Sequence, residues 1–83
     1  MDTRTEIKEF IVDNFMMGMN PENLTNNVSL LELGIIDSTG VLELVQFLEE
    51  KYGIQVEDAD LTPANLDSLE NLVGYLNNKK SLN

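Results

Sequence analysis

The sequence predicts an all-α protein, a small bundle of four helices with three longer helices and one short one. Apolar side chains recur at spacings of three and four residues in three separate stretches, and favoured capping residues precede those stretches. The chain has 83 residues, of which 42% are hydrophobic. This length suits a single domain over residues 1–83, with a core too small for a deep enclosed active site.

The first helix is expected from about Arg4 to Met17. Thr3 and Glu6 have the spacing of a capping box at its start. Gly18 is expected to end it, because glycine readily takes the left-handed conformation that closes helices. The expected apolar face consists of Ile7, Phe10, Ile11 and Phe15.

The polar stretch from Gly18 to Ile36 is expected to be a long loop. Loops of this length are uncommon inside compact domains, so apolar anchors must hold this one against the core. Ser29 and Glu32 have the spacing to cap a single helical turn within it. The candidate anchors are Leu24, Val28, Leu30, Leu31 and Leu33.

The best-defined helix is expected from Ser38 to Tyr52. Asp37 is a favoured N-cap residue, and Gly53 can close the far end. Ser38 then lies in the first turn, where free backbone N–H groups and the helix dipole favour an anion such as a phosphate ester. The apolar face of this helix consists of Val41, Leu44, Val45, Leu48 and Tyr52.

Two more helices are expected near the C-terminus. Thr62 and Pro63 have the N-cap and N1 arrangement of a short helix. Asp67 and Glu70 are spaced like the cap and the N3 partner of the last helix. Its apolar stripe consists of Leu69, Leu72, Val73 and Leu76.

The charge balance limits the kinds of partner. Fifteen acidic residues against five basic ones give a formal net charge of −10. Such a field repels nucleic acid and anionic lipid and attracts basic protein surfaces. No apolar run approaches the roughly 20 residues that span a bilayer. We therefore expect a monomeric cytoplasmic protein with protein partners, and neither nucleic acid nor membrane among them.

Residues 33–52 read LGIIDSTGVLELVQFLEEKY. The pattern Leu-Gly-x-x-Asp-Ser, followed by Glu-Leu-Val and Leu-Glu-Glu, resembles the phosphopantetheine attachment helix of acyl carrier proteins. The resemblance implies a covalent 4'-phosphopantetheine arm on Ser38, with Asp37 as part of the motif, added by a phosphopantetheinyl transferase. It also implies a non-catalytic carrier, whose partner enzymes load and process acyl or aminoacyl groups held as thioesters.

The motif differs from that of bacterial fatty-acid carriers, which typically read Leu-Gly-Ala-Asp-Ser-Leu. Here two isoleucines precede Asp37, and Thr39 and Gly40 follow Ser38. The sequence Gly-Ile-Ile-Asp-Ser-Thr-Gly is more similar to stand-alone carriers of specialised pathways, including D-alanyl and other aminoacyl carriers. The resemblance therefore implies a specialised acyl or aminoacyl cargo with a dedicated loading enzyme.

Ser68 is a rival to Ser38, because Asp67 and Ser68 also form an Asp-Ser pair at a helix start. Only fifteen residues follow Ser68, too few to build and pack another helix beyond the last one. A catalytic role for Ser38 is not expected, since the chain has no histidine to act as its base. Asp37 has two open roles, a backbone cap and a contact to the modifying enzyme or its Mg²⁺.

The outer face of the Ser38 helix is a candidate docking surface. Exposed carboxylates around one exposed leucine suit a partner with a basic rim and an apolar notch. Its members are Leu42, Glu43, Gln46, Glu49 and Glu50. The alternative is a face that is merely solvated, and the alternative function is an unmodified acidic helical interaction module. No metal site is expected, because the residues after Asp58 and Asp60 do not continue the ligand pattern of an EF-hand.

Overall fold

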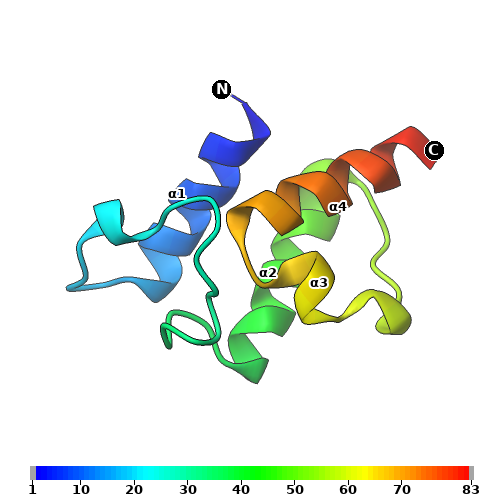
Figure 1. The fold of residues 1–83 in the computed structure, drawn as a ribbon. Coiled ribbons are helices and arrows are strands. Elements are labelled where there is room, and N and C mark those ends of the chain that lie inside the picture. The colour runs from blue at the N-terminus through cyan, green and yellow to red at the C-terminus, as the bar shows by residue number, and fades with distance from the viewer. Residues whose placement is uncertain (1, 83) are drawn as a thin grey trace.

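The computed structural model describes residues 2–82, and their side chains as far as Lys80. Three longer helices and one short helix form the bundle, which confirms the predicted fold (Figure 1). The helices are α1 (Thr3–Phe15), α2 (Ser38–Tyr52), α3 (Pro63–Leu66) and α4 (Leu69–Leu82), with the short 3-10 helices η1 (Pro21–Asn23) and η2 (Asp58–Asp60). Within the described residues, no helix has the length and apolar character needed to cross a membrane.

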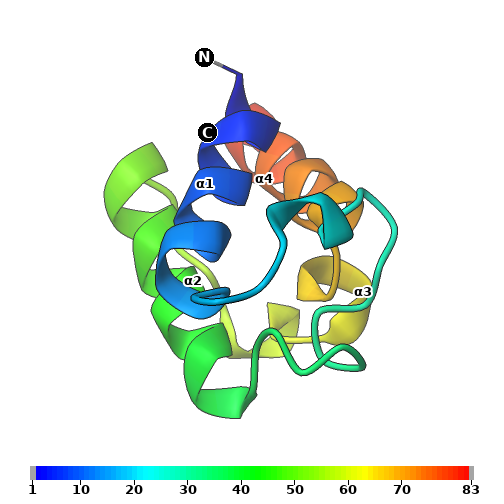
Figure 2. The same ribbon diagram turned by 90° about the vertical axis from the view of Figure 1, so that its left-hand side faces the viewer.

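The core draws on all four helices and on the loop between α1 and α2. Burying one such aliphatic side chain contributes roughly 1.5–3 kcal/mol, so these side chains together are a main source of the stability of the bundle. The buried hydrophobic residues are Ile7, Ile11, Met16, Leu24, Leu30, Ile35, Ile36, Leu44, Leu48, Ile54, Leu66, Leu69, Leu72, Tyr75 and Leu76. Figure 2 shows the long loop leaving α1 and passing the beginning of α4 before it reaches α2.

The predicted bounds of α2 are confirmed. The Asp37 carboxylate accepts a hydrogen bond of 2.8 Å from the backbone N–H of Gly40, as an N-cap residue does. Gly53 has a φ of 66° and ends the helix in the left-handed conformation. Strong local signals at both ends explain why the sequence located this helix correctly.

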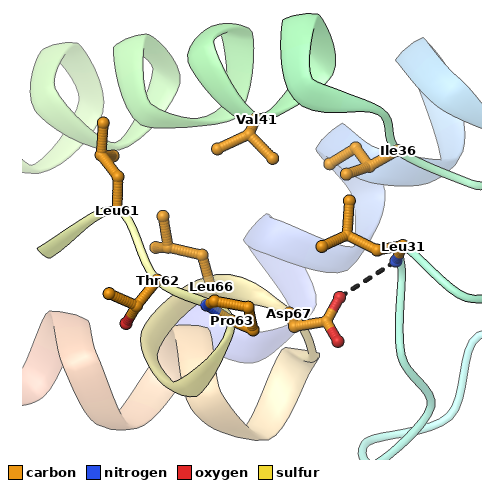
Figure 3. Close-up of a pocket in the computed structure, with 8 residues that line it drawn as sticks. All are labelled: Leu31, Ile36, Val41, Leu61, Thr62, Pro63, Leu66 and Asp67. Atoms are coloured by element: carbon orange, nitrogen blue, oxygen red, sulfur yellow. Dashed lines mark hydrogen bonds between the residues drawn. The ribbon is translucent and has the colours of Figure 1, made fainter.

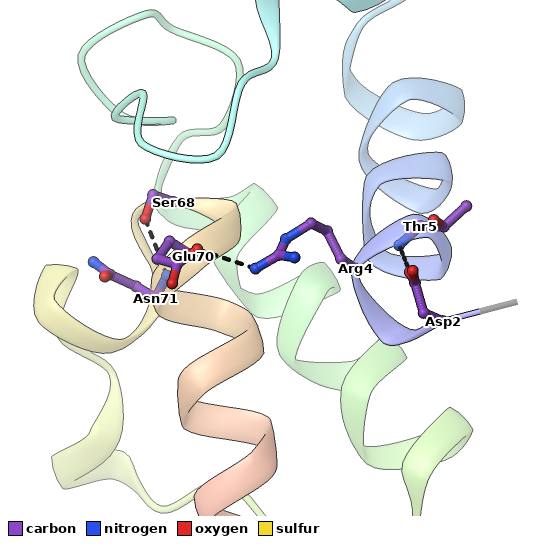
Figure 4. Close-up of polar contacts among 6 residues, drawn as sticks. All are labelled: Asp2, Arg4, Thr5, Ser68, Glu70 and Asn71. Carbon is purple, nitrogen blue, oxygen red and sulfur yellow. Dashed lines mark hydrogen bonds and ion pairs between the residues drawn. The ribbon is translucent and has the colours of Figure 1, made fainter.

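The predicted capping box of α1 is wrong. Asp2, not Thr3, is the N-cap residue, and its carboxylate accepts a 2.8 Å hydrogen bond from the N–H of Thr5 (Figure 4). The Glu6 carboxylate instead accepts a hydrogen bond from the Tyr52 hydroxyl, at 2.9 Å. Asp2 and Thr3 are adjacent in the sequence, and both are favoured capping residues. The long Glu6 side chain does not bond to the cap but makes a contact between α1 and α2.

The C-terminal end of α1 also differs from the prediction. The helix ends at Phe15 rather than Met17, and Gly18 lies beyond the end, with a φ of 81°. Met16 leaves the helical conformation, and its side chain is only 2% exposed. Burial of this thioether therefore marks the end of the helix, where the sequence suggested a glycine.

The long loop is anchored by only part of the predicted set. Leu24 and Leu30 are buried, as expected, whereas Leu31 and Leu33 are 43% and 49% exposed. The prediction that these last two residues are anchors is wrong. The Ser29 hydroxyl oxygen accepts a hydrogen bond from the N–H of Glu32, which confirms the predicted capped turn. Leu31, Glu32, Leu33 and Gly34 of this turn are all exposed.

The predicted cap of α4 is wrong as well. Ser68 is in the capping position, and its hydroxyl oxygen accepts a 3.1 Å hydrogen bond from the N–H of Asn71 (Figure 4). The Asp67 carboxylate turns instead to the long loop, where it accepts hydrogen bonds from the Ser29 hydroxyl and, at 3.0 Å, from the N–H of Leu31. Asp67 thus joins the loop before α2 to the junction of α3 and α4.

Asp67→Ala is expected to lower the free energy of unfolding by about 2 kcal/mol, because it leaves a part-buried hydroxyl and a backbone N–H without their acceptor. Urea unfolding followed by circular dichroism measures this loss. Asp13→Ala removes the same charge from an exposed position on α1 and is the matched control. Its expected effect is within about 0.5 kcal/mol, and equal losses in the two variants would contradict the role of Asp67.

Candidate functional site

Ser38 is the first residue of α2, and its side chain is exposed. The N–H groups in the first turn of a helix have no helical acceptors and carry the positive end of the helix dipole. Asp37 takes one of these donors, the N–H of Gly40, and its own carbonyl accepts from Val41 at 2.9 Å. The cap role of Asp37 is therefore confirmed, and the remaining first-turn donors are available to an anion on Ser38.

Ser68 has a different environment from Ser38. Its residue is 7% exposed, and its oxygen is already the acceptor for the Asn71 N–H. An enzyme that modifies a serine must reach the hydroxyl with its own catalytic groups. Because Ser68 is buried, its hydroxyl cannot be reached in this way, whereas Ser38 is exposed at the beginning of its helix.

Gly40 allows close packing directly beside the Ser38 turn. A Cβ atom at position 40 would lie 3.1 Å from Cγ1 of Ile36 and 3.3 Å from Cε1 of Phe15. A larger side chain would push α1 away from the beginning of α2 or displace Ile36, which is buried. In the sequence this glycine was only a departure from the fatty-acid pattern. Its packing role depends on a contact between helices that local sequence does not reveal.

An apolar pocket of about 70 Å³ lies between α2 and α3 (Figure 3). Val41 points into it from α2, and because Val41 lies three residues after Ser38, the two side chains share one side of the helix. The lining residues are Leu31, Ile36, Val41, Leu61, Thr62, Pro63, Leu66 and Asp67. The volume suits a few methylene groups but not a long acyl chain.

Three of the five predicted docking residues lie together. Glu43, Gln46 and Glu50 line a shallow groove between α1 and α2. Its apolar part is made by Phe10 and Phe47, whose rings stack with their centroids 4.0 Å apart. The aromatic pair was not predicted as part of the site, because its two members lie far apart in the sequence.

The other two predicted docking residues lie outside this groove. Leu42 is 60% exposed, and its register places it on the side of α2 that carries Ser38. Glu49 has a structural contact, because its carboxylate accepts a 2.9 Å hydrogen bond from the N–H of Val56. This bond fixes the beginning of the segment that connects α2 to α3.

The ion pairs leave the outer face of α2 acidic. Three of the five basic residues pair with carboxylates on other parts of the fold: Arg4 with Glu70 at 3.0 Å (Figure 4), Lys51 with Glu6 at 3.4 Å and Lys79 with Asp60 at 3.8 Å. Within residues 2–82, no group of three or more histidine, cysteine, aspartate or glutamate side chains is arranged to hold a metal ion.

A family model described as the phosphopantetheine attachment site matches residues 16–76. The chain belongs to the acyl carrier protein family. The acyl carrier protein of Zymomonas mobilis is 28% identical over 80 residues, covering 96% of this chain and 97% of that protein. The acyl carrier protein of Campylobacter hominis is 30% identical over 78 residues, covering 94% of each chain.

Two solved structures have a similar fold. The solution structure of a holo acyl carrier protein from Nitrosomonas europaea has a TM-score of 0.77 and 23% identity, covering 98% of this chain and 99% of that one, and it supports the fold. A chain in a crystal structure described as an FAD-dependent dehydrogenase has a TM-score of 0.74 and 27% identity, covering 84% of this chain and 97% of that one.

The predicted family, cofactor and non-catalytic role are confirmed by this membership. As an acyl carrier protein, the chain carries intermediates on a phosphopantetheine arm and works with a phosphopantetheinyl transferase and with enzymes that process the cargo. The alternative of an unmodified interaction module does not fit this family.

Proposed function

We propose that Ser38 carries the 4'-phosphopantetheine arm. The observation that carries this proposal is the contrast between the two Asp-Ser serines: Ser38 is exposed at the start of a long helix, whereas Ser68 is buried with its oxygen engaged. The first-turn N–H groups and the dipole of α2 stabilise the negative phosphodiester. Asp37 is turned toward the backbone by its bond to Gly40, which reduces its repulsion of that phosphate.

The pocket beside Val41 supports a second part of the proposal, that the bundle shelters the end of a cargo. The arm supplies a thiol that holds the cargo as a thioester, and the protein supplies an apolar surface on the same side of α2 as Ser38. The chain has no cysteine and no histidine. Both the attachment of the arm and the loading of the thiol are therefore reactions of partner enzymes.

Ser38→Ala is expected to abolish attachment, because it removes the hydroxyl that accepts the phosphopantetheinyl group. Intact mass after incubation with coenzyme A and a phosphopantetheinyl transferase measures this, with circular dichroism to show that the variant is folded. Ser68→Ala is the matched control. It should lose about 1 kcal/mol of stability through its cap yet be modified normally. An arm on the Ser38→Ala protein would contradict the proposal.

We also propose that partner enzymes dock on the groove between α1 and α2 and on Leu42. Its acidic rim and aromatic floor suit a partner surface whose arginine or lysine side chains lie over Phe10 and Phe47 and pair with Glu43 and Glu50. These two glutamates are absent from the three ion pairs described above.

The cytoplasmic location and monomeric state expected from the sequence stay predictions.

Reversing Glu43 and Glu50 to lysine should slow association with the transferase by about tenfold at low salt, because rim charges act mainly on the association rate. Stopped-flow measurements at low and high salt give the rates, and the effect should shrink as salt rises. Glu9→Lys with Glu57→Lys makes the same change in net charge at exposed positions away from this groove. Equal slowing in both double variants would mean that net charge alone, and not this surface, steers the encounter.

The cargo is proposed to be a specialised acyl or aminoacyl group. Support comes from the departure of the motif from the fatty-acid pattern at Thr39 and Gly40. The similarity to a chain of an FAD-dependent dehydrogenase structure adds flavin-dependent dehydrogenases to the processing enzymes worth testing.

The carrier is expected to support reconstituted fatty-acid synthesis poorly, as measured by product formation. Full support of that cycle would contradict a specialised cargo.

A further inference from the structure

The wall of the pocket that contains Leu61 and Pro63 is held to α4 by the Asp60 carboxylate and by the side-chain amide of Asn71, which donates to the carbonyl of Pro63 at 3.2 Å. Asp60 directly precedes Leu61, which lines the pocket. The Tyr75 hydroxyl donates a 2.7 Å hydrogen bond to Oδ2 of Asp60, and Nζ of Lys79 lies 3.8 Å from the same oxygen. Tyr75 is only 8% exposed, and burial together with the Asp60 carboxylate raises the pKa of its phenol. The hydroxyl therefore remains a hydrogen-bond donor at neutral pH.

The same segment is held at its other end by α2. The Glu49 carboxylate accepts the N–H of Val56, four residues before Asp60. Between these two bonds the chain forms only η2, and the side-chain amide of Asn65 donates to the carbonyl of Asp60 at 3.0 Å. The wall thus has little regular structure of its own, and its position depends on these few hydrogen bonds.

The opposite wall is firmer. Val41 belongs to the 15-residue helix α2, whereas Leu61 lies between η2 and α3 and belongs to no helix. A cargo longer than the pocket therefore displaces the segment that contains Leu61 before it displaces α2 or α3, because Leu66 of α3 is 4% exposed and packs in the core. Such a displacement stretches the hydrogen bond between Tyr75 and Asp60.

We propose that Tyr75, acting through Asp60, limits the length of the cargo that the carrier shelters. The inference rests on the proposed function, because it requires a cargo held from Ser38 in the pocket beside Val41. Tyr75 does not line the pocket. It is a positioning residue, and its hydroxyl holds the wall in the closed position.

The chain contains a matched control for this hydrogen bond. The Tyr52 hydroxyl donates to the Glu6 carboxylate at 2.9 Å, and Nζ of Lys51 lies 3.4 Å from that carboxylate. This second tyrosine, carboxylate and lysine cluster joins α2 to α1, and none of its members lines the pocket. Tyr52→Phe therefore removes the same kind of bond without releasing the pocket wall.

The test loads the arm of the wild type, Tyr75→Phe and Tyr52→Phe with acyl groups from butanoyl to dodecanoyl. The rate at which hydroxylamine cleaves each thioester, followed by intact mass, reports how well the chain is sheltered. Tyr75→Phe should protect medium-length chains several-fold better than the wild type, because the wall moves more easily, while Tyr52→Phe should match the wild type. A Tyr75→Phe profile identical to the wild type, or the same shift in Tyr52→Phe, overturns the proposal.

A second measurement needs neither arm nor cargo. Hydrogen exchange of the unmodified protein should be faster in Tyr75→Phe than in the wild type at Thr62 and Asn65, whose N–H groups bond within the wall segment. Unchanged exchange would show that Tyr75 does not hold the wall. Absence of an arm on Ser38 would instead contradict the proposed function and, with it, the length limit, whereas unchanged exchange overturns the length limit alone. A modified wild type that protects no chain of any length would overturn both the shelter and its length limit.

Discussion

The hydrogen bonds of Asp67 are the constraint on which the arrangement of the site depends. The loop before α2 has almost no regular structure, yet it must deliver Ser38 to the beginning of that helix and present Leu31 to the pocket. Asp67 fixes this loop with its side chain, and its backbone carbonyl accepts the N–H of Leu30 at 2.8 Å. Because Asp67 also joins α3 to α4 and lines the pocket, one residue sets the loop, the pocket and the last helix relative to one another.

Two of the basic residues form ion pairs between helices. Arg4 pairs across to Glu70 on α4, and Lys51 pairs with Glu6 on α1. Exposed pairs of this kind contribute little stability, at most about 1 kcal/mol each. Their larger consequence concerns the field around the molecule, because they neutralise carboxylates between helices and leave Glu43 and Glu50 to dominate the outer face of α2. Glu43 and Glu50 therefore contribute to the net charge of −10 at a surface where a basic partner can approach.

The sequence predicted the bounds of α2, and with them the place of Ser38 in its first turn, because the signals there are local. Asp37, the apolar face and Gly53 all act within the helix that they define. The caps of α1 and α4 were mispredicted because two capping residues stand side by side at each start, and contacts distant in sequence decide between them. The loop carries Asp67 away from α4, so that Ser68 takes its place. The pocket and the pair of Phe10 and Phe47 were beyond prediction for the same reason, since their members meet only in the folded chain.

The energies involved make a length limit at this pocket gradual rather than absolute. A typical hydrogen bond inside a protein contributes a net of about 1 kcal/mol, and burying one methylene group contributes about 0.8 kcal/mol. One or two further methylene groups in the pocket therefore offset the loss of the bond between Tyr75 and Asp60. A cargo slightly longer than the closed pocket opens the wall for part of the time, and a much longer one holds it open. A carrier that must release its cargo to several enzymes gains from this near balance, because a small contribution from a docked partner is enough to withdraw the chain.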